Sequence, residues 1–131
     1  RTTLSPSLAL KDGKPFMVFG TPGGDQQDQW STLMFLHHAD HRMNLQESID
    51  CPAFHTDHFP SSFWPRAYQS KKVVLEGRFP DSTISELKRR GHDIEIGEPW
   101  SEGRLTAASS DGSTLKAAAN ARGMQGYAAG R

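Results

Sequence analysis

Two adjacent glycines, Gly23 and Gly24, are the first residues in the sequence that could do chemistry. They follow the apolar segment 16–19 and precede a segment with helical periodicity. Side-chain-free backbone lets two successive N–H groups face a cavity at the positive end of a helix, where they can stabilise the oxyanion of an acyl-transfer reaction. The same Pro-Gly-Gly would also serve as a plain turn. A phosphate-binding loop is not expected, because the sequence here has neither a Gly-x-Gly-x-x-Gly motif nor a Gly-Lys-Ser/Thr ending.

Histidine and aspartate side chains indicate a second possible chemistry, metal binding. His37 and His41 are four residues apart on one helix face, and His55 or Asp57 could complete a His/carboxylate site. The glutamate of the metalloprotease helix motif is missing. Histidines near the C-terminal end of a helix also cap carbonyls without any metal. Metal binding therefore stays an alternative, and no metal or cofactor is assigned to the chain.

Thr2 and Thr3 place two adjacent hydroxyl groups near the start of the chain. Hydroxyls can donate hydrogen bonds to a carboxylate. Hydroxyl side chains near a chain end are more often simply solvated, so the pair alone predicts little.

Regular elements must position these groups, and the first half of the chain is readily interpreted. Ser7–Leu10, an Asp-Gly turn and Pro15–Gly20 predict a β-hairpin. The continuously apolar segment Phe16–Phe19 predicts a buried central strand. Apolar residues at helical spacing predict a helix over Asp28–Asp40.

The second half of the chain alternates strands and helices. Asn44 and Glu47 form a capping-box pattern for a short helix that ends before Pro52. We also expect an irregular segment over Pro52–Pro65, a strand over Val73–Phe79 and a helix over Asp81–Arg90 with Gly91 at its end. A strand over His92–Ile96 and a hairpin of Leu105–Ser109 and Thr114–Ala119 complete the predicted elements. This order predicts an α+β fold of antiparallel strands covered by helices.

Length and charge narrow the possible partners. The 131 residues fit one unit, and 15 Lys and Arg balance 15 Asp and Glu. No basic patch for nucleic acid, membrane span or signal peptide is evident, although the compartment stays open. Cys51 is the single cysteine, which excludes an internal disulfide. The low apolar content is typical of a piece whose surface finishes a larger fold.

Several motifs, taken in order, resemble the γ-glutamyltransferase (γ-glutamyltranspeptidase) family. Thr2 to Pro6 is similar to its Ser-Ser-Met-Ser-Pro segment, and Gly20 to Gly24 to its Gly-Ser-Pro-Gly-Gly. Met43 to Asp50 matches the family's Met-Asn-Leu-Gln-Glu-Ala-Ile-Asp type of helix. Pro52 to His55 occupies the place where the family has Pro-Arg-Phe-His. The match extends to the closing residues Arg122 to Tyr127 and covers nearly the whole chain. The chain therefore resembles the C-terminal part of the family's small subunit.

The resemblance implies an N-terminal nucleophile hydrolase with an αββα sandwich, which transfers or hydrolyses γ-glutamyl groups of substrates such as glutathione. Carried over by motif, Thr2 and Thr3 would hold the glutamyl α-carboxylate, and Gly23 and Gly24 would donate to the oxyanion. A related acylase or amidase, or a non-catalytic structural piece, is the alternative.

Three departures from the family pattern qualify the resemblance. Ala53 stands where an arginine is common, which removes a charge. Asp25 would oppose an oxyanion if it pointed inward, so it is expected to face away or to bind an amine. The threonine nucleophile and the acidic groups for the substrate amine lie upstream in the family. The chain alone is therefore expected to be inactive and to need the large subunit and the rest of the small subunit as partners.

Overall fold

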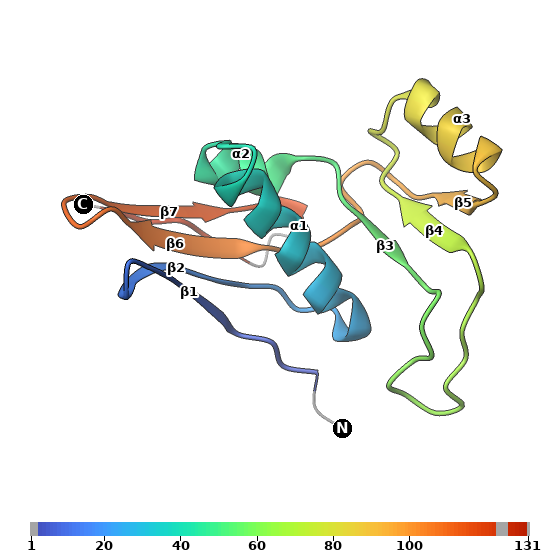
Figure 1. Ribbon diagram of the computed structural model, residues 1–131, viewed down its shortest axis with the longest axis horizontal. Coiled ribbons are helices and arrows are strands. Elements are labelled where there is room, and N and C mark those ends of the chain that lie inside the picture. The colour runs from blue at the N-terminus through green and yellow to red at the C-terminus, as the bar shows by residue number, and fades with distance from the viewer. Residues whose placement is uncertain (1–2, 123–125, 131) are drawn as a thin grey trace.

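A four-stranded antiparallel sheet with the strand order β1-β2-β6-β7 carries most of the core (Figure 1). The computed structural model describes residues 3–122 and 126–130. The strands are β1 (Ser7–Lys11), β2 (Lys14–Gly20), β6 (Thr106–Ser110) and β7 (Leu115–Ala119). Asp12 and Gly13 both have positive φ, 52° and 75°, as a tight hairpin turn requires. Both predicted hairpins are confirmed.

Two helices cover one face of this sheet. A short 3₁₀ turn, η1 (Gly24–Gln26), leads into α1 (Gln27–Ala39), and α2 (Leu45–Asp50) follows. The predicted capping box is present, because Glu47 N–H donates to Asn44 Oδ1 and Asn44 N–H donates to Glu47 Oε2. The core between helices and sheet consists of Met17, Trp30, Met34, Leu45, Ile49, Ala53, Leu105, Ala107 and Ala118. In the described part of the chain no helix has the length and apolarity to cross a membrane.

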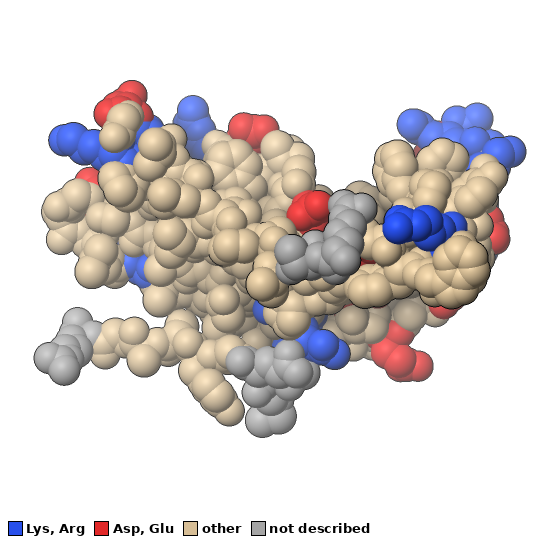
Figure 2. Space-filling view, turned by 90° about the horizontal axis from the view of Figure 1, so that it is seen from below, with Lys and Arg blue, Asp and Glu red and all other residues tan. Residues whose placement is uncertain are grey.

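The opposite face of the four-stranded sheet is apolar and exposed. Strand register places Leu8, Val18, Ala108 and Ala117 in one row across the sheet. β2 is central, as predicted, but Val18 is 49% exposed, so the prediction of a strand buried on both faces is wrong for this chain. An apolar groove of about 750 Å³ runs along this face. Figure 2 shows the molecule from below, with Lys, Arg, Asp and Glu side chains at both ends and near the middle, and uncharged residues over most of the area between them.

A smaller sheet joins β3 (Phe54–Thr56), β4 (Lys72–Leu75) and β5 (Asp93–Ile96). β3 lies within the segment predicted to be irregular, so that prediction is wrong for Phe54–Thr56. β4 and β5 are parallel, because α3 (Asp81–Arg89) provides a crossover between them. This pair departs from the antiparallel pairing expected throughout. Gly91 has a φ of 91° after the helix end, as predicted.

The strand predicted to run to Phe79 ends at Leu75, because the next residue, Glu76, turns into the interior. Its side chain is fully buried and meets the buried side chain of Arg122. Arg122 Nε donates to Glu76 Oε1 at 2.6 Å. The same guanidinium donates to the carbonyl oxygens of Ile49 and Cys51 at 2.8 and 2.9 Å, which joins the end of α2 to the C-terminal segment.

Further donors complete the shell around Glu76. The N–H groups of Ala53 and Glu102 donate to its carboxylate at 3.2 and 3.0 Å, and Arg78 Nη2 donates at 2.6 Å. The Arg78 guanidinium lies 3.4 Å from the centre of the Trp100 ring. The Arg122 guanidinium also lies over this ring. The N–H of buried Ala53 and the guanidinium groups of Arg78 and Arg122 thus share the Glu76 carboxylate.

Burial acts to raise the pKa of Glu76, but hydrogen bonds from Arg122, Arg78 and the Glu102 N–H outweigh it and hold the pKa below its ordinary 4.5. A carboxyl group with a lowered folded-state pKa stabilises the fold above its unfolded pKa. That contribution is lost as the pH falls through the folded-state value.

We expect Glu76→Gln to lower the free energy of unfolding by about 3 kcal/mol at pH 7, because it leaves Arg122 buried without its counter-charge. Urea denaturation measures this loss. The difference from wild type should shrink as the pH falls below 4.5 and through the lower folded-state pKa of Glu76, where the native carboxyl also becomes neutral. Glu86→Gln, on the exposed face of α3, is the matched control and should unfold at the same urea concentration as wild type. Equal effects of the two substitutions would contradict this assignment.

Candidate functional site

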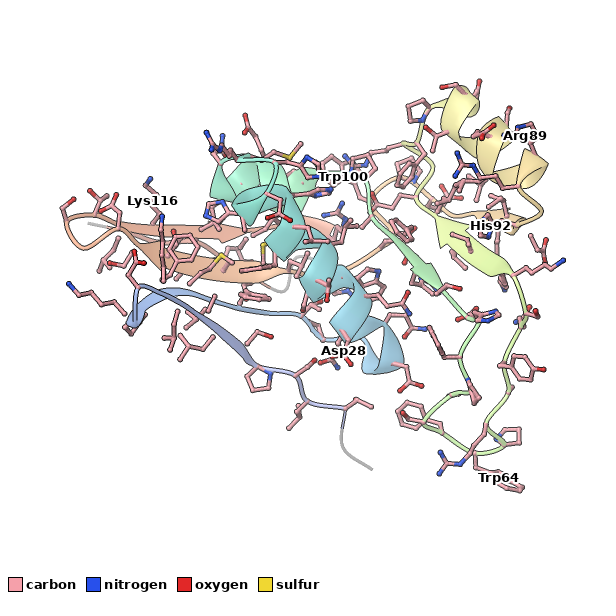
Figure 3. The ribbon with its side chains drawn as sticks, viewed as in Figure 1. Asp28, Trp64, Arg89, His92, Trp100 and Lys116 are labelled. Carbon is pink, nitrogen blue, oxygen red and sulfur yellow. The ribbon has the colours of Figure 1, made fainter. Side chains whose placement is uncertain are left out.

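A cavity of about 770 Å³ lies between three segments that are distant in sequence. The N-terminal segment contributes Thr3, Leu4 and Ser5. The second wall is η1 and the start of α1, with Gly24, Asp25, Gln26, Asp28 and Gln29, and the third wall consists of residues from Thr56 to Gln69. Figure 3 shows Asp28 at the start of α1, and Trp64 at the tip of the segment between β3 and β4. Two of the predicted site residues, Thr3 and Gly24, therefore share one cavity.

The glycine turn has a geometry that side chains cannot adopt without strain. Gly23 has a φ of 141° and Gly24 a φ of 63°. A Cβ atom at Gly23 would lie 2.2 Å from the Trp30 ring, whereas one at Gly24 would meet Phe63 at an ordinary 3.6 Å. Gly24 lines the cavity, and Gly23 lies beside it against the indole. Glycine is thus required at Gly23 by packing and favoured at Gly24 by backbone conformation.

The N-terminal segment is attached to the start of α1. Ser5 Oγ donates to Gln27 Oε1 at 2.8 Å, and Gln27 is buried. This bond attaches the segment that contains the cavity-lining Thr3 to α1. The second predicted hydroxyl, that of Thr2, lies outside the described residues.

A buried polar network supports the glycine turn from behind. Trp30 Nε1 donates to Glu102 Oε2 at 3.1 Å, and His55 Nδ1 contacts the same oxygen. The Trp30 and His55 rings meet edge to face. Because the Glu102 N–H donates to Glu76, the network that positions Trp30 is continuous with the buried ion pair. The indole that packs on Gly23 is therefore fixed at its polar end.

The network reaches the cavity through Asp57. His55 Nε2 lies 3.6 Å from Asp57 Oδ1, and Lys72 Nζ lies 3.7 Å from Asp57 Oδ2. Lys72 also pairs with Glu95 at 2.7 Å, and this hydrogen bond is the main reason that the pKa of Lys72 is raised. Asp57 is thus a cavity-lining carboxylate whose neighbours are His55 and Lys72.

Gln29 joins α1 to β3. Its side chain accepts from the Thr56 N–H at 2.7 Å and donates to the Thr56 carbonyl at 3.0 Å. This pair of bonds imitates a neighbouring strand, so the edge of β3 is satisfied by a helix side chain. It fixes the small sheet against the start of α1.

Asp25 was expected to face away from an oxyanion or to bind an amine. Its carboxylate accepts from Ser61 Oγ at 3.1 Å and from the Ser62 N–H at 2.6 Å. The charge directly after the glycines is therefore directed toward the segment between β3 and β4, where two neutral donors stabilise it.

The four residues of the alternative metal site do not come together. The His37 and His41 rings lie 6.0 Å apart, while His55 and Asp57 belong to the network with Glu102 and Lys72. Within residues 3–122 and 126–130, no group of three His, Cys, Asp or Glu side chains could hold a metal ion. Burial lowers the pKa of His37, a backbone hydrogen bond with Ser48 partly offsets this, and His41 lowers it further.

Comparison with known proteins agrees with this arrangement of segments. The family model described as Gamma-glutamyltranspeptidase matches residues 1–130. The chain belongs to the γ-glutamyltranspeptidase family. The resemblance inferred from the sequence is thereby confirmed.

Individual family relatives give the extent of the similarity. The glutathione hydrolase-like YwrD proenzyme of Bacillus subtilis is 36% identical over 94 residues, which are 72% of this chain and 17% of that protein. The solved structure of LmbA2991HD is 53% identical with a TM-score of 0.91, over 96% of this chain and 23% of that one. A cephalosporin acylase from Bacillus halodurans is 26% identical with a TM-score of 0.75, over 89% of this chain and 20% of that one.

Two facts follow for the family member described here. The mixed α+β architecture is that of N-terminal nucleophile hydrolases, as predicted. The chain also spans only about a fifth of the length of these relatives.

The sequence did not reveal several residues that shape the site. Glu102, His55 and Gln29 act through contacts made across more than 25 residues of sequence. The sequence indicates His55 and Asp57 as possible metal ligands, and His55 also as the end of the Pro52 to His55 motif, but not as members of this network. A polar Gln29 directly before the apolar Trp30 was the available signal for a buried hydrogen bond at the start of α1.

We expect Gly23→Ala to destabilise the protein more than Gly24→Ala. A methyl group at Gly23 collides with Trp30, whereas at Gly24 the cost is that of the left-handed conformation, about 1 kcal/mol. Urea denaturation of both variants measures the difference. Gly112→Ala, with a φ of 93° and open space around it, is a control for backbone strain alone and should resemble Gly24→Ala. Equal losses at Gly23 and Gly112 would contradict the packing argument.

Proposed function

We propose that this chain works as the C-terminal part of the small subunit of a longer proenzyme that transfers or hydrolyses γ-glutamyl amides. One observation carries the proposal: Thr3 and Gly24, which are 21 positions apart, line the same cavity. Family membership supports the reaction class, and the glutathione hydrolase names of several relatives support the donor.

The proposed mechanism assigns one task to each group. The hydroxyls of Thr2 and Thr3 bind the α-carboxylate of the donor, which fixes the γ-carbonyl in the cavity. The N–H groups of Gly23 and Gly24 donate to the oxygen of that carbonyl as negative charge develops on it. These donors are preorganised, because Trp30 and the positive φ values fix the turn.

The nucleophile comes from the remaining part of the enzyme in this proposal. An N-terminal threonine attacks the γ-carbonyl carbon, with its own amine as the base. The chain by itself would then bind but not turn over substrate.

The exposed face of the four-stranded sheet supports the need for a partner segment. Its row of Leu8, Val18, Ala108 and Ala117 is apolar, and the small alanines permit close approach of another sheet. We assign this face to the second sheet of the αββα sandwich, contributed by the rest of the proenzyme. The low apolar content of the chain agrees with a core completed from outside.

A related amidase reaction is the second candidate. The oxamate amidohydrolase proenzyme of Klebsiella pneumoniae is 38% identical over 101 residues of this chain, and the acylase structure shares the fold. The oxyanion donors would serve any amide, so the group held by Thr3 decides between the candidates.

Thr3→Ala in the complete proenzyme should raise the KM for a γ-glutamyl anilide about tenfold or more, because a hydrogen bond to a charged carboxylate is lost. Thr3→Ser should restore it. Gly24→Val should instead depress kcat, by roughly 100-fold, since it disturbs an oxyanion donor. Steady-state kinetics separates these effects, with Thr114→Ala on the distant hairpin as the control. Unchanged turnover in Gly24→Val would refute the oxyanion assignment.

We expect Val18→Glu to block formation of the complete enzyme, because it buries a charge between the two proposed sheets. Size-exclusion chromatography and the yield of active enzyme measure this effect. Lys11→Glu, at the exposed end of β1, provides a charge change off the apolar row and should leave the yield unchanged. A normal yield with Val18→Glu would show that another surface covers this sheet.

A further inference from the structure

The peptide group between Pro22 and Gly23 carries one of the two proposed oxyanion donors, the N–H of Gly23. This peptide is trans, because the cis bond of the chain is the one between Trp64 and Pro65. In a planar trans peptide the C=O and the N–H point in opposite directions and can only turn together. The direction of the Pro22 carbonyl therefore sets the direction of the Gly23 N–H.

The backbone on either side of this peptide resists its rotation only weakly. The proline ring fixes φ of Pro22, so the plane of the peptide depends on ψ of Pro22 and φ of Gly23. Gly23 has a φ of 141° and no Cβ atom to oppose a change in that angle. The Trp30 ring packs on Gly23, but its N–H donates to Glu102 and not to this peptide. A hydrogen bond to the peptide itself is therefore needed to hold its plane.

The side chain of Thr21 supplies that hydrogen bond. Its hydroxyl donates to the Pro22 carbonyl oxygen at 2.8 Å and accepts from the Arg104 N–H at 2.9 Å. A hydroxyl has one proton to donate and lone pairs to accept with, so it can serve both partners at once. Because the Arg104 N–H occupies a lone pair, the hydroxyl proton is left for the Pro22 carbonyl. Two segments that are 83 positions apart thus meet at one hydroxyl group.

The donor to Thr21 belongs to a segment that is itself fixed against Trp30. The Glu102 carboxylate accepts from Trp30 Nε1. Gly103, with a φ of 74°, lies so close to the indole that a Cβ atom there would be 3.5 Å from Trp30 Cγ. Arg104 is the next residue. This segment therefore holds both the indole that packs on the glycine turn and the hydroxyl that binds the peptide before it.

We propose that Thr21 is a positioning residue for the oxyanion donors, and that its hydroxyl, held by the Arg104 N–H, fixes the Pro22–Gly23 peptide in the orientation that the reaction needs. The inference rests on the proposed function and adds a residue to the same site. Thr21 does not line the cavity, so its effect reaches the substrate through the Gly23 N–H. Loss of the bond lets the peptide turn away and leaves the developing charge with one donor instead of two.

The test uses the complete proenzyme and the hydrolysis of a γ-glutamyl anilide. Thr21→Val keeps the shape of the side chain but removes the hydroxyl, so kcat should fall about three- to tenfold with the KM nearly unchanged. Thr21→Ser keeps the hydroxyl and should restore kcat to nearly the wild-type value. Thr114→Val makes the same change on the distant β6–β7 hairpin, as the matched control, and should leave both constants unchanged.

A second measurement separates the oxyanion interaction from the rest of the fold. A donor analogue with a boronic acid in place of the γ-amide becomes tetrahedral when a nucleophile adds to boron, and one of its oxygens then takes the place of the oxyanion. Its inhibition constant should rise about three- to tenfold in Thr21→Val. The inhibition constant of L-glutamate, which has no tetrahedral centre at the γ-carbon, should stay nearly the same.

An unchanged kcat in Thr21→Val would overturn the inference while leaving γ-glutamyl hydrolysis intact. An equal loss in Thr21→Ser would also overturn it, because serine keeps both hydrogen bonds. A higher KM with a normal kcat would do the same, since that result would place Thr21 in donor binding. Failure of wild type to hydrolyse the anilide would instead overturn the proposed function, and the inference with it.

Discussion

The carboxylate of Glu76 has no contact with solvent, and the arrangement of the molecule follows from satisfying it. A buried charge is tolerated only when a counter-charge and hydrogen bonds replace its hydration. Here the donors come from Arg122, Arg78, Ala53 and Glu102, which belong to separate segments of the chain. Satisfying one side chain therefore holds the end of α2, one end of the small sheet and the C-terminal segment together.

The ion pair of Glu76 and Arg122 is connected to the proposed active site through two further contacts. Glu102, whose N–H binds Glu76, presents its own carboxylate to Trp30 and His55. Trp30 then packs against Gly23 so closely that no side chain fits there. Oxyanion donors need a backbone that does not reorganise during the reaction, and a turn fixed by an anchored indole meets this need.

Local features of the chain were predictable because they depend on neighbouring residues. The Asp12-Gly13 turn, the Asn44/Glu47 capping box and the left-handed Gly91 follow from short-range sterics and hydrogen bonds, and all are present. The three-residue strand β3 was missed, because its pattern is too short and its partners are β4 and the side chain of Gln29. The parallel pairing of β4 with β5 also depends on where α3 returns the chain, which no periodicity specifies.

The sequence by itself determined the family, the order of nearly all the elements and the glycine turn, since these are written in contiguous motifs. Only the tertiary structure decided that Thr3 and Gly24 share a cavity, that Asp25 binds the segment between β3 and β4, and that His55 and Asp57 join a polar network rather than a metal site. The physical reason is that burial and ion pairing are properties of segments brought together from far apart. A residue type indicates which bonds a side chain can make, and the fold determines which partner it meets.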